Sequence, residues 1–479
     1  MKNIKIILLT LLGLFLFQSC SEDILDDINT NPNEPTDVPS RLIITDVMVA
    51  SAFSLTAADN SFYAGVYSEL NAGNHNQTYK AQTRDGEPQK STTYNNAWNT
   101  SYRQLRSLKI ILEKCSTGGS EQGNYQTLGV AQILYAYNLA LLTDLFGDVP
   151  HSEALNIQNL QPKLDKQEMI YQEVFKMLNE GIVNLGKTSS YASLGSQDVV
   201  YGGNSSKWIK AANGLLARYT MRLSLVKPNY QAVIDYVDNS FTNATDEFKL
   251  VNGGITNPYA RFEMDRGGLC VAKSFYDLMV ANGSADARTA VFFTKKNGAV
   301  NPLDNSLLNP MEAQNVYSIS GIMNAKNPIY VQGYHELLFL KAEAQARLGQ
   351  EAAAKATLNL AIKAAYTKQQ VVAFTSAQAD AYIASIGTLA GRKLLKKIMI
   401  EKHISFYENE GIEDYNDTRR LAAMGDGDLV PLVNARPELF PQRFGYGNSD
   451  VSANVHVREA FGDGSYVYKE KVWWAGGTR

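Results

Sequence analysis

The chain has 479 residues, of which 45% are hydrophobic and 19% charged, so it has enough apolar material for a packed core. At about 100 to 200 residues per domain, this length allows two to four conventional domains or one long stacked structure. The formal net charge is −3, with no strongly basic half. A nucleic-acid partner is excluded, because binding to phosphates by counterion release needs an excess of lysine and arginine.

The chain begins with the features of a secretory signal. Two lysines precede an apolar run over residues 6–17, which is shorter than the roughly 20 residues that a membrane-spanning helix needs. The run ends at Ser19 and Cys20, and this end resembles the lipobox of bacterial lipoproteins. We therefore expect residues 1–19 to be a signal peptide that is removed, and Cys20 to be the lipid attachment site and the only link to the membrane. The alternative is a general signal peptide in which Cys20 is incidental.

Residues 20–40 are predicted to form an acidic, flexible tether, because asparagine and proline are frequent there and apolar residues are few. The acidic pair Glu22 and Asp23 resembles the export signal that carries some Gram-negative lipoproteins to the outer face of the outer membrane. This predicts an outer-membrane protein that faces the cell exterior. Disulfides are possible in that compartment, but the sequence does not show whether Cys115 and Cys270 pair.

Helical periodicity covers much of the remaining chain. Apolar residues recur at helical spacing over residues 92–115, 125–146, 206–226 and 392–407. A further helix is predicted to begin at Asp165, which with Glu168 has the spacing of an N-cap and its N3 partner, and to end at Gly186.

The clearest helical pair spans residues 334–366. Leu348 is predicted to end the apolar stripe of the first helix, and Gly349 to supply a left-handed stop. The length of about 33 residues matches the tetratricopeptide period, although the full residue signature is missing. We therefore expect a mostly α fold, built as a tetratricopeptide-like scaffold of helical pairs.

Two segments, at about residues 241–327 and 425–463, have a different composition. Glycine, asparagine, aspartate and proline interrupt short apolar runs, which predicts loops with a few short strands. We expect residues 41–479 to form a single domain in which these loop-rich insertions make up a variable lobe. Binding residues are commonly found on loops that a rigid scaffold carries.

No catalytic motif fits its context. Residues 181–188 match the phosphate-binding pattern GxxxxGK[ST], but they complete a predicted helix where the motif needs a preceding strand. The five histidines are far apart, which predicts no metal site, and nothing indicates a cofactor. We predict that the protein is not an enzyme. A helical glycosidase is the remaining catalytic alternative, because two carboxylates at the right separation would suffice.

Several conspicuous side chains are assigned to the scaffold. Arg218 and Arg222 lie one helical turn apart and could bind an anion, but their apolar neighbours favour packing. Trp98 lies on an apolar helical stripe and is also assigned to packing. The lysine-rich run over residues 392–402 is typical of a solvated helix face.

Several strings occur in the same order as in one known family. They are DLFGDVPHSEAL (residues 144–155), the helix from KW to the paired arginines (207–222), ELLFLKAEA (336–344), EGIEDYNDTRR (410–420) and VWW (472–474). The chain resembles the SusD/RagB nutrient-binding lipoproteins, in the SusD-like branch. It departs from the family's RFPYPxxE turn, which is RFGYGNSD here, and Ala475 stands where an aspartate is common. The shared strings fall mostly in predicted helices, so we interpret them as fold determinants.

The resemblance implies a helical protein that sits as a lid over a TonB-dependent, SusC-like outer-membrane transporter. Such a protein captures a nutrient and passes it to the barrel without breaking bonds. The nutrient is commonly an oligosaccharide, which is our leading hypothesis, and in some members a peptide. A plain tetratricopeptide scaffold for other proteins is a further alternative.

Sugar rings present apolar C–H faces and many hydroxyls, so a sugar site needs aromatic platforms beside amide, carboxylate or guanidinium groups. Two predicted loop segments, residues 67–84 and 257–265, have that mixture. For each aromatic residue, the alternative is a half-buried loop anchor. The candidate ligand-binding residues are Tyr67, Asn71, Asn74, His75, Tyr79, Arg84, Tyr259, Arg261, Phe262 and Glu263.

Overall fold

The computed structural model describes residues 37–478 except residue 252 and residues 369–373. The chain divides into two units, Met1–Pro39 and Ser40–Arg479. Of the first unit only residues 37–39 are described, and they form no helix or strand. The predicted signal peptide, Cys20 and nearly all of the tether therefore lie outside the described residues, and the predicted domain boundaries remain predictions.

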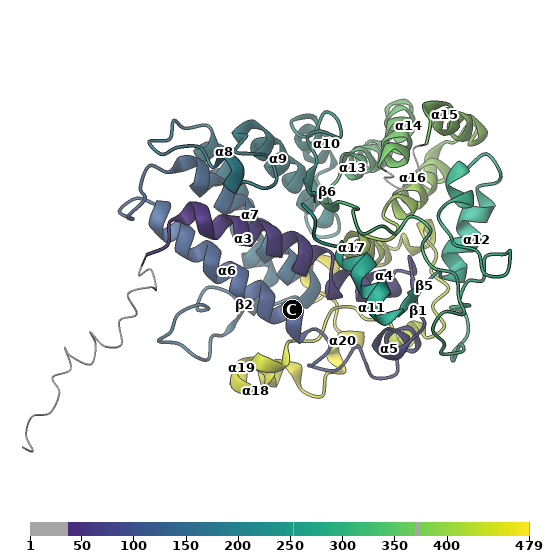
Figure 1. The fold of residues 1–479 in the computed structure, drawn as a ribbon, viewed down its shortest axis with the longest axis horizontal. Helices are drawn as coiled ribbons and strands as arrows, with labels where there is room; N and C mark the ends of the chain where they lie inside the picture. Colours follow the sequence, from purple (N-terminus) through teal and green to yellow (C-terminus); the bar gives the residue numbers. More distant parts are fainter. Residues whose placement is uncertain (1–36, 252, 369–373, 479) are drawn as a thin grey trace, which may run out of the picture. The chain divides into compact units, whose positions relative to one another are not determined.

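The second unit is mostly helical, as predicted (Figure 1). Its first helices are α3 (Ser40–Ala50), the π-helix η1 (Ser51–Thr56), α4 (Asp59–Tyr67), α5 (Asn76–Thr83), α6 (Asn95–Cys115), α7 (Tyr125–Phe146), α8 (Gln167–Leu185), α9 (Ser205–Arg222) and α10 (Tyr230–Asp238). Those that follow are α11 (Pro258–Arg266), α12 (Lys273–Ala281), α13 (Tyr334–Arg347), α14 (Glu351–Thr367), α15 (Ser376–Ser385), α16 (Gly391–Ser405), α17 (Gly411–Ala423), α18 (Asn448–Ala453), α19 (Val455–Phe461) and α20 (Tyr466–Lys469). The predicted helices are confirmed as α6, α7, α8, α9, α13, α14 and α16, with small shifts at their ends.

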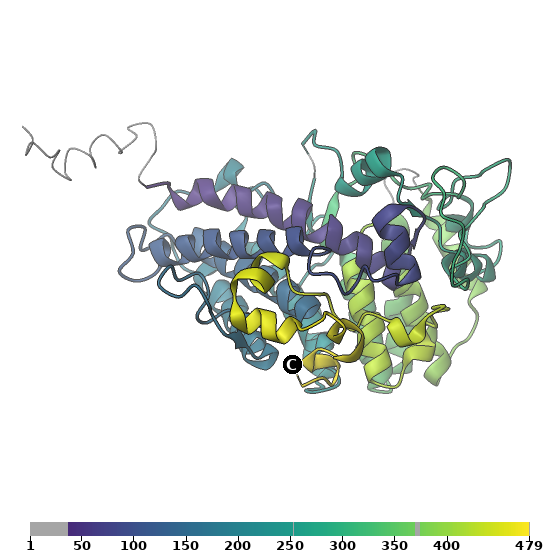
Figure 2. The same cartoon turned by 90° about the horizontal axis from the view of Figure 1, so that it is seen from below.

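Helix α7 lies at the centre of the core. Its sequence is apolar nearly all round, and its residues from Thr127 to Phe146 are all buried. In the described part of the chain, α7 and the stretch Ser40–Tyr67 are long and apolar enough to cross a membrane, but the apolar window of α7 is wholly buried inside the protein. Helices α6 and α8 pack along it, and Figure 2 shows α3 lying beside α6.

The predicted pair of α13 and α14 is confirmed. Gly349 adopts φ +74°, which ends the first helix in a left-handed turn. Ala342 of α13 and Ala354 and Ala361 of α14 are fully buried in one apolar cluster, so small side chains allow the two helices to approach closely. The prediction for Leu348 is wrong, because this residue lies just beyond the end of α13 and is 43% exposed.

The start of α8 differs from the prediction. Lys166 is the N-cap residue and makes no side-chain capping bond, whereas Asp165 belongs to a short strand. The Asp165 carboxylate instead accepts hydrogen bonds from the backbone N–H groups of His151 and Ser152, each at 2.9 Å. Gly186 does cap the helix end, so the GxxxxGK[ST] string completes α8, as expected for a chance match.

The strands form two-stranded antiparallel sheets. The pairs are β1 (Ala72–Gly73) with β5 (Leu269–Cys270), β2 (Val149–Pro150) with β3 (Leu164–Asp165), and β4 (Phe248–Leu250) with β6 (Ile329–Gln332). The segment predicted as loops over residues 241–327 also contains α11 and α12. Helix α11 has strong local signals, since Asn257 caps it and Pro258 occupies its first turn. Cys115 and Cys270 are both buried and free.

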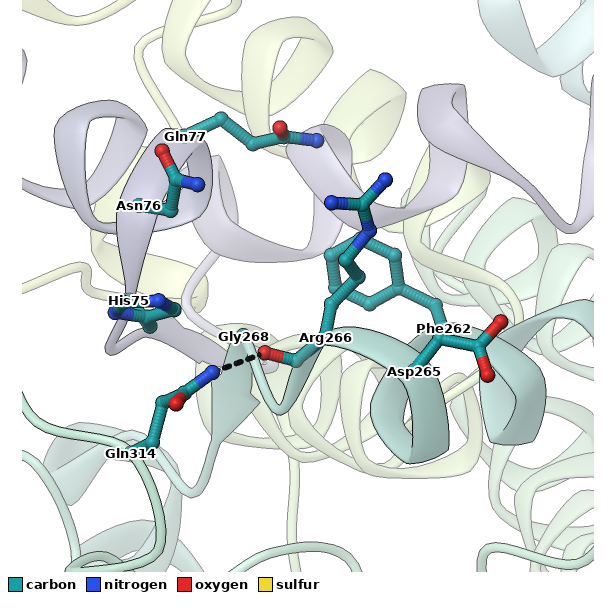
Figure 3. A pocket seen from close by; sticks show the side chains of 8 residues that line it. All are labelled: His75, Asn76, Gln77, Phe262, Asp265, Arg266, Gly268 and Gln314. Atoms are coloured by element: carbon teal, nitrogen blue, oxygen red, sulfur yellow. Dashed lines mark hydrogen bonds between the residues drawn. The ribbon is translucent and has the colours of Figure 1, made fainter.

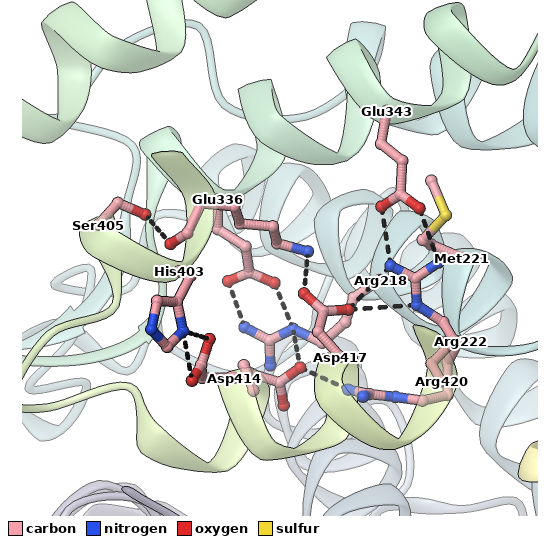
Figure 4. Close-up of polar contacts among 12 residues, drawn as sticks. Arg218, Met221, Arg222, Glu336, Glu343, His403, Ser405, Asp414, Asp417 and Arg420 are labelled. Atoms are coloured by element: carbon pink, nitrogen blue, oxygen red, sulfur yellow. Dashed lines mark hydrogen bonds and ion pairs between the residues drawn. The ribbon is translucent and has the colours of Figure 1, made fainter. Parts of the chain in front are cut away.

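Buried ion pairs join α9, α13, α16 and α17 (Figure 4). The guanidinium of Arg218 in α9 donates to both carboxylate oxygens of Glu336 in α13, each at 2.6 Å. Arg222, one turn further along α9, donates to Glu413 of α17 at 2.5 Å. A charge removed from water needs such a partner, so each pair fixes how two helices meet.

Two more pairs extend this buried ion-pair network. Arg420 of α17 donates to both oxygens of Glu343 in α13, each at 2.8 Å. Lys402 of α16 lies 2.6 Å from Asp417 and is buried, so the prediction that the whole lysine-rich run faces solvent is wrong at this position. The paired residues come mainly from the strings over 207–222, 336–344 and 410–420, which agrees with their interpretation as fold determinants.

Candidate ligand-binding site

The two segments predicted to bind a ligand, residues 67–84 and 257–265, lie next to each other. Strand β1 pairs with β5, which directly follows α11. Beyond β1, the backbone N–H of Asn74 donates to the carbonyl oxygen of Gly268 at 3.1 Å. These contacts bring the start of α5 to the end of α11.

Close packing at this junction depends on Gly73. A Cβ atom at Gly73 would lie 1.9 Å from the carbonyl oxygen of Thr78, where real Cβ atoms are not found. The Thr78 hydroxyl donates to the carbonyl oxygen of Gly268 at 2.5 Å. The Asn74 amide donates to the carbonyl oxygen of Ala313 at 2.9 Å. The polar side chains of this turn therefore hold backbone segments together.

A pocket of about 160 Å³ opens between α5, α11 and the segment around residue 314 (Figure 3). One aromatic ring, one guanidinium, one carboxylate, one imidazole and several carboxamides face it. Figure 3 shows the side chain of Arg266 extending toward Gln77 of α5. The residues that line this α5–α11 pocket are His75, Asn76, Gln77, Phe262, Asp265, Arg266, Gly268 and Gln314.

The aromatic wall of the pocket is held by helix α4. The rings of Phe262 and Phe62 have centroids 4.4 Å apart and an interplanar angle of 33°. Tyr259 packs edge-on against Phe62 at 5.6 Å. The orientation of the half-buried Phe262 ring is thus fixed from the protein side, which leaves its other face for a ligand.

The charged groups of the pocket differ in how far they are already paired. His75 Nδ1 lies 3.3 Å from Glu312, which also accepts the backbone N–H of Asn76 at 2.7 Å. Asp265 is bound to Arg261 at 2.5 Å. Arg266 is exposed and makes no ion pair with any described residue, so its guanidinium can donate to a ligand.

Glu263 lies near the pocket but does not line it. Its Oε2 accepts the backbone N–H of Leu269 at 3.1 Å. Burial raises the pKa of Glu263 to about 7, although the hydrogen bond from Leu269 acts in the opposite direction. The charge of the Glu263 carboxyl, which lies beside the pocket, therefore changes close to neutral pH.

Of the residues predicted to bind a ligand, His75 and Phe262 line this pocket. Tyr67 is fully buried, and its hydroxyl lies 2.6 Å from that of Tyr94. The Arg84 guanidinium lies over the Tyr67 ring, 4.8 Å from its centroid. Tyr67 and Arg84 therefore belong to the core.

The other predicted residues brace the region around the pocket. Asn71 and Tyr259 are buried. Tyr79 donates its hydroxyl to the carbonyl oxygen of Pro310 at 2.8 Å. Arg261 is exposed on α11 and bound to Asp265. Direct ligand contact by these residues remains a prediction.

The sequence did not single out five polar residues that line the pocket: Asn76, Gln77, Asp265, Arg266 and Gln314. Four of them lie inside or directly beside the predicted segments, but composition alone does not distinguish them from the other polar residues there. Gln314 has no local signal, because it reaches the site through the fold, where its amide donates to the carbonyl oxygen of Arg266 at 2.7 Å.

No cluster of three or more His, Cys, Asp or Glu residues suited to a metal ion occurs in the described part of the chain. The pocket offers a ring face and several polar groups that are exposed to solvent. We interpret this pocket, carried by a scaffold of helical pairs, as a candidate ligand-binding site.

Comparison with known proteins identifies the family. Residues 32–446 match the SusD-like family, described as starch-binding and associating with the outer membrane, and the chain belongs to this family. Its members are binding proteins, so the chain is a binding protein and not an enzyme. No curated protein matches the chain.

Solved structures agree with this assignment. A SusD/RagB family protein from Bacteroides thetaiotaomicron is 33% identical with a TM-score of 0.82, covering 92% of this chain and 100% of that one. A chitin-binding SusD homologue from Flavobacterium johnsoniae is 19% identical with a TM-score of 0.73, over 91% and 98% of the two chains. Another chitin-binding protein is 23% identical with a TM-score of 0.74, over 91% and 99%. The last two show the fold alone.

Proposed function

We propose that the protein is a lipoprotein of the cell surface that binds an oligosaccharide in the α5–α11 pocket and delivers it to a SusC-like, TonB-dependent transporter. The starch-binding description of the family and the chitin-binding activity of two proteins with the same fold support a glycan ligand. The observation that carries the proposal is the pocket itself, in which the Phe262 ring lies beside the unpaired Arg266 guanidinium and several carboxamides.

This arrangement matches the chemistry of a sugar. The apolar face of a pyranose ring packs on an aromatic ring, and its hydroxyls accept from a guanidinium and exchange hydrogen bonds with carboxamides. A volume of about 160 Å³ is below the roughly 300 to 1,000 Å³ of pockets that enclose a small molecule. An oligosaccharide would therefore seat one part in the pocket and extend across the surface.

Calorimetry with chitohexaose and maltoheptaose tests the ligand class. We expect Phe262→Ala to weaken binding about 10-fold, through loss of the ring face, and Arg266→Ala about 10- to 100-fold, through loss of charged hydrogen bonds. Arg458→Ala, an exposed arginine on α19, is the matched control and should leave the Kd unchanged. If calorimetry detects binding of peptides from a tryptic digest of casein and no binding of either sugar, the ligand is a peptide and the oligosaccharide proposal is wrong.

The anchor and the partner need separate tests, because Cys20 lies outside the described residues. Palmitate should label the wild type and not Cys20→Ala, and protease added to whole cells should cleave the protein. Co-purification with a TonB-dependent barrel from detergent-solubilised membranes tests the transporter. Absence of label from the wild type would remove the lipoprotein proposal while leaving the sugar-binding result intact.

A further inference from the structure

A second pocket lies between α8, α9, α10 and the C-terminal 3₁₀ helix η6 (Trp473–Ala475). Its volume is about 460 Å³, within the range of pockets that hold a small molecule. No residue of this α8–α10 pocket lines the α5–α11 pocket, and Figure 1 shows α8, α9 and α10 well separated from α5 and α11. The proposed function does not involve it.

Aromatic rings form the floor of the α8–α10 pocket. Tyr171 is buried at the bottom, where its hydroxyl donates to Asp144 at 2.5 Å. The rings of Phe175 and Trp473 flank it, each with its centroid 6.4 Å from that of Tyr171, at interplanar angles of 41° and 46°. The buried ring is thus fixed, and two half-buried rings lie next to it.

Trp473 differs from the other tryptophans of the chain. Trp98, Trp208 and Trp474 are fully buried. Trp474 packs between the guanidinium groups of Arg222 and Arg419, 5.4 and 4.8 Å from its ring centroid. Packing therefore explains Trp474, whereas Trp473 is half-buried, lines the pocket and packs against the core with only part of its ring. The Lys227 ammonium lies 5.5 Å from the Trp473 ring centroid, so a sugar that packs on that side of the ring must displace this flexible, exposed side chain.

Polar groups surround the aromatic floor. The Gln172 amide and the Tyr236 hydroxyl have no hydrogen-bond partner among the described residues. The side-chain oxygen of Asn229 caps α10 by accepting the backbone N–H of Ala232 at 3.1 Å, and its NH₂ group has no hydrogen-bond partner among the described residues. Lys227 and Glu168 form an exposed ion pair of 2.8 Å at the rim.

We propose that the α8–α10 pocket is a second carbohydrate-binding site, independent of the α5–α11 pocket. The flanking rings would pack against the C–H faces of one or two sugar units. The amides of Gln172 and Asn229 and the Tyr236 hydroxyl would bond to the sugar hydroxyls. A purely apolar ligand would leave these groups unused, whereas a sugar uses both the rings and the polar rim.

Fluorine NMR of protein labelled with 5-fluorotryptophan tests this site directly. Trp473→Phe identifies the Trp473 resonance, and the three buried tryptophans serve as internal controls. The probes are chitohexaose, maltoheptaose, cellohexaose and xylohexaose at millimolar concentration. We expect at least one sugar to shift the Trp473 resonance in a saturable way, and Tyr236→Ala to weaken that binding about fivefold.

The Phe262→Ala/Arg266→Ala double variant separates the two sites. A Trp473 shift that persists in the double variant supports the second site, even if calorimetry shows no binding at the α5–α11 pocket. A shift that disappears in the double variant overturns it, because the signal then comes from the first pocket. A Trp473 resonance that no probe moves also overturns it, and would turn attention to a protein partner for this surface, while calorimetry on the same samples still decides the proposed function.

Discussion

The buried ion-pair network and the α5–α11 pocket both contain arginine and carboxylate side chains, but they use charge in opposite ways. In the network, Arg218 and Glu336 are 3% and 2% exposed and satisfy each other. In the pocket, Arg266 is exposed and has no ion-pair partner in the described part of the chain. The first arrangement specifies how helices meet, and the second leaves a donor for a ligand.

This difference explains what a family resemblance can and cannot convey. A buried charge tolerates few substitutions, because removing its partner leaves it unpaired away from water. An exposed pocket residue carries no such constraint, so it can vary with the ligand. The strings shared with the family therefore indicate the scaffold, and the nutrient has to be inferred from the pockets.

The largest effect is expected from breaking the network at Arg218. Arg218→Met leaves the Glu336 carboxylate buried without its partner, and should lower the free energy of unfolding by about 3–5 kcal/mol in urea titrations. The double variant Arg218→Met/Glu336→Met should recover part of that loss, because the Glu336 carboxylate is then no longer buried without its partner. Lys363→Met, which breaks an exposed pair with Asp380, is the control and should cost less than about 1 kcal/mol. If Arg218→Met and Lys363→Met lower the free energy of unfolding equally, buried and exposed ion pairs do not differ in the way proposed.

The second prediction concerns the junction that shapes the pocket. Gly73→Ala places a methyl group against the Thr78 carbonyl, so α5 must shift relative to β1. We expect a loss of about 1–3 kcal/mol in the free energy of unfolding and a larger proportional loss of oligosaccharide affinity. Gly283→Ala is a comparison at a glycine whose Cβ would contact nothing but whose φ is +78°, so it should cost stability without loss of binding. Unchanged binding by Gly73→Ala would show that the junction does not shape the site.

The scaffold could be predicted from sequence because its signals are local. The α13–α14 pair follows from helical periodicity and from Gly349, and α7 from apolar residues that recur at helical spacing. The pocket depends on the pairing of β1 with β5, strands too short to give any periodic pattern. The two segments that contribute to it were identified by composition. Gln314 was not, since only the folded chain brings it to the carbonyl oxygen of Arg266.

The third prediction concerns Glu408, a buried carboxyl that differs from those of the network because burial raises its pKa. Glu408 is buried, and burial raises its pKa to about 7, with Lys368 and nearby hydrogen bonds only partly opposing this. The Glu408 carboxyl therefore stays protonated up to a higher pH in the folded state than in the unfolded state, where its pKa is about 4.5. Its contribution to stability is complete below pH 4.5 and is lost as the pH rises through 7.

Urea titrations across this pH range measure the effect. The wild type should lose up to about 1.4 kcal/mol per pH unit between pH 5 and 7 from this group. Glu408→Gln should flatten that part of the profile, and Glu459→Gln, at an exposed position, should not. A profile in Glu408→Gln as steep as that of the wild type would show that another group titrates in this range.

The smallest effect is expected at the edge of the pocket. Gln314 is exposed, and its amide bonds only to the Arg266 carbonyl at 2.7 Å among the hydrogen bonds of the described residues. Gln314→Ala should therefore change the free energy of unfolding by less than about 0.5 kcal/mol, as surface substitutions usually do. Its carboxamide also faces the pocket, so loss of one neutral hydrogen bond should weaken oligosaccharide binding about two- to tenfold in calorimetry. If Gln314→Ala lowers the free energy of unfolding and leaves oligosaccharide binding unchanged, Gln314 supports the scaffold and does not contact the ligand.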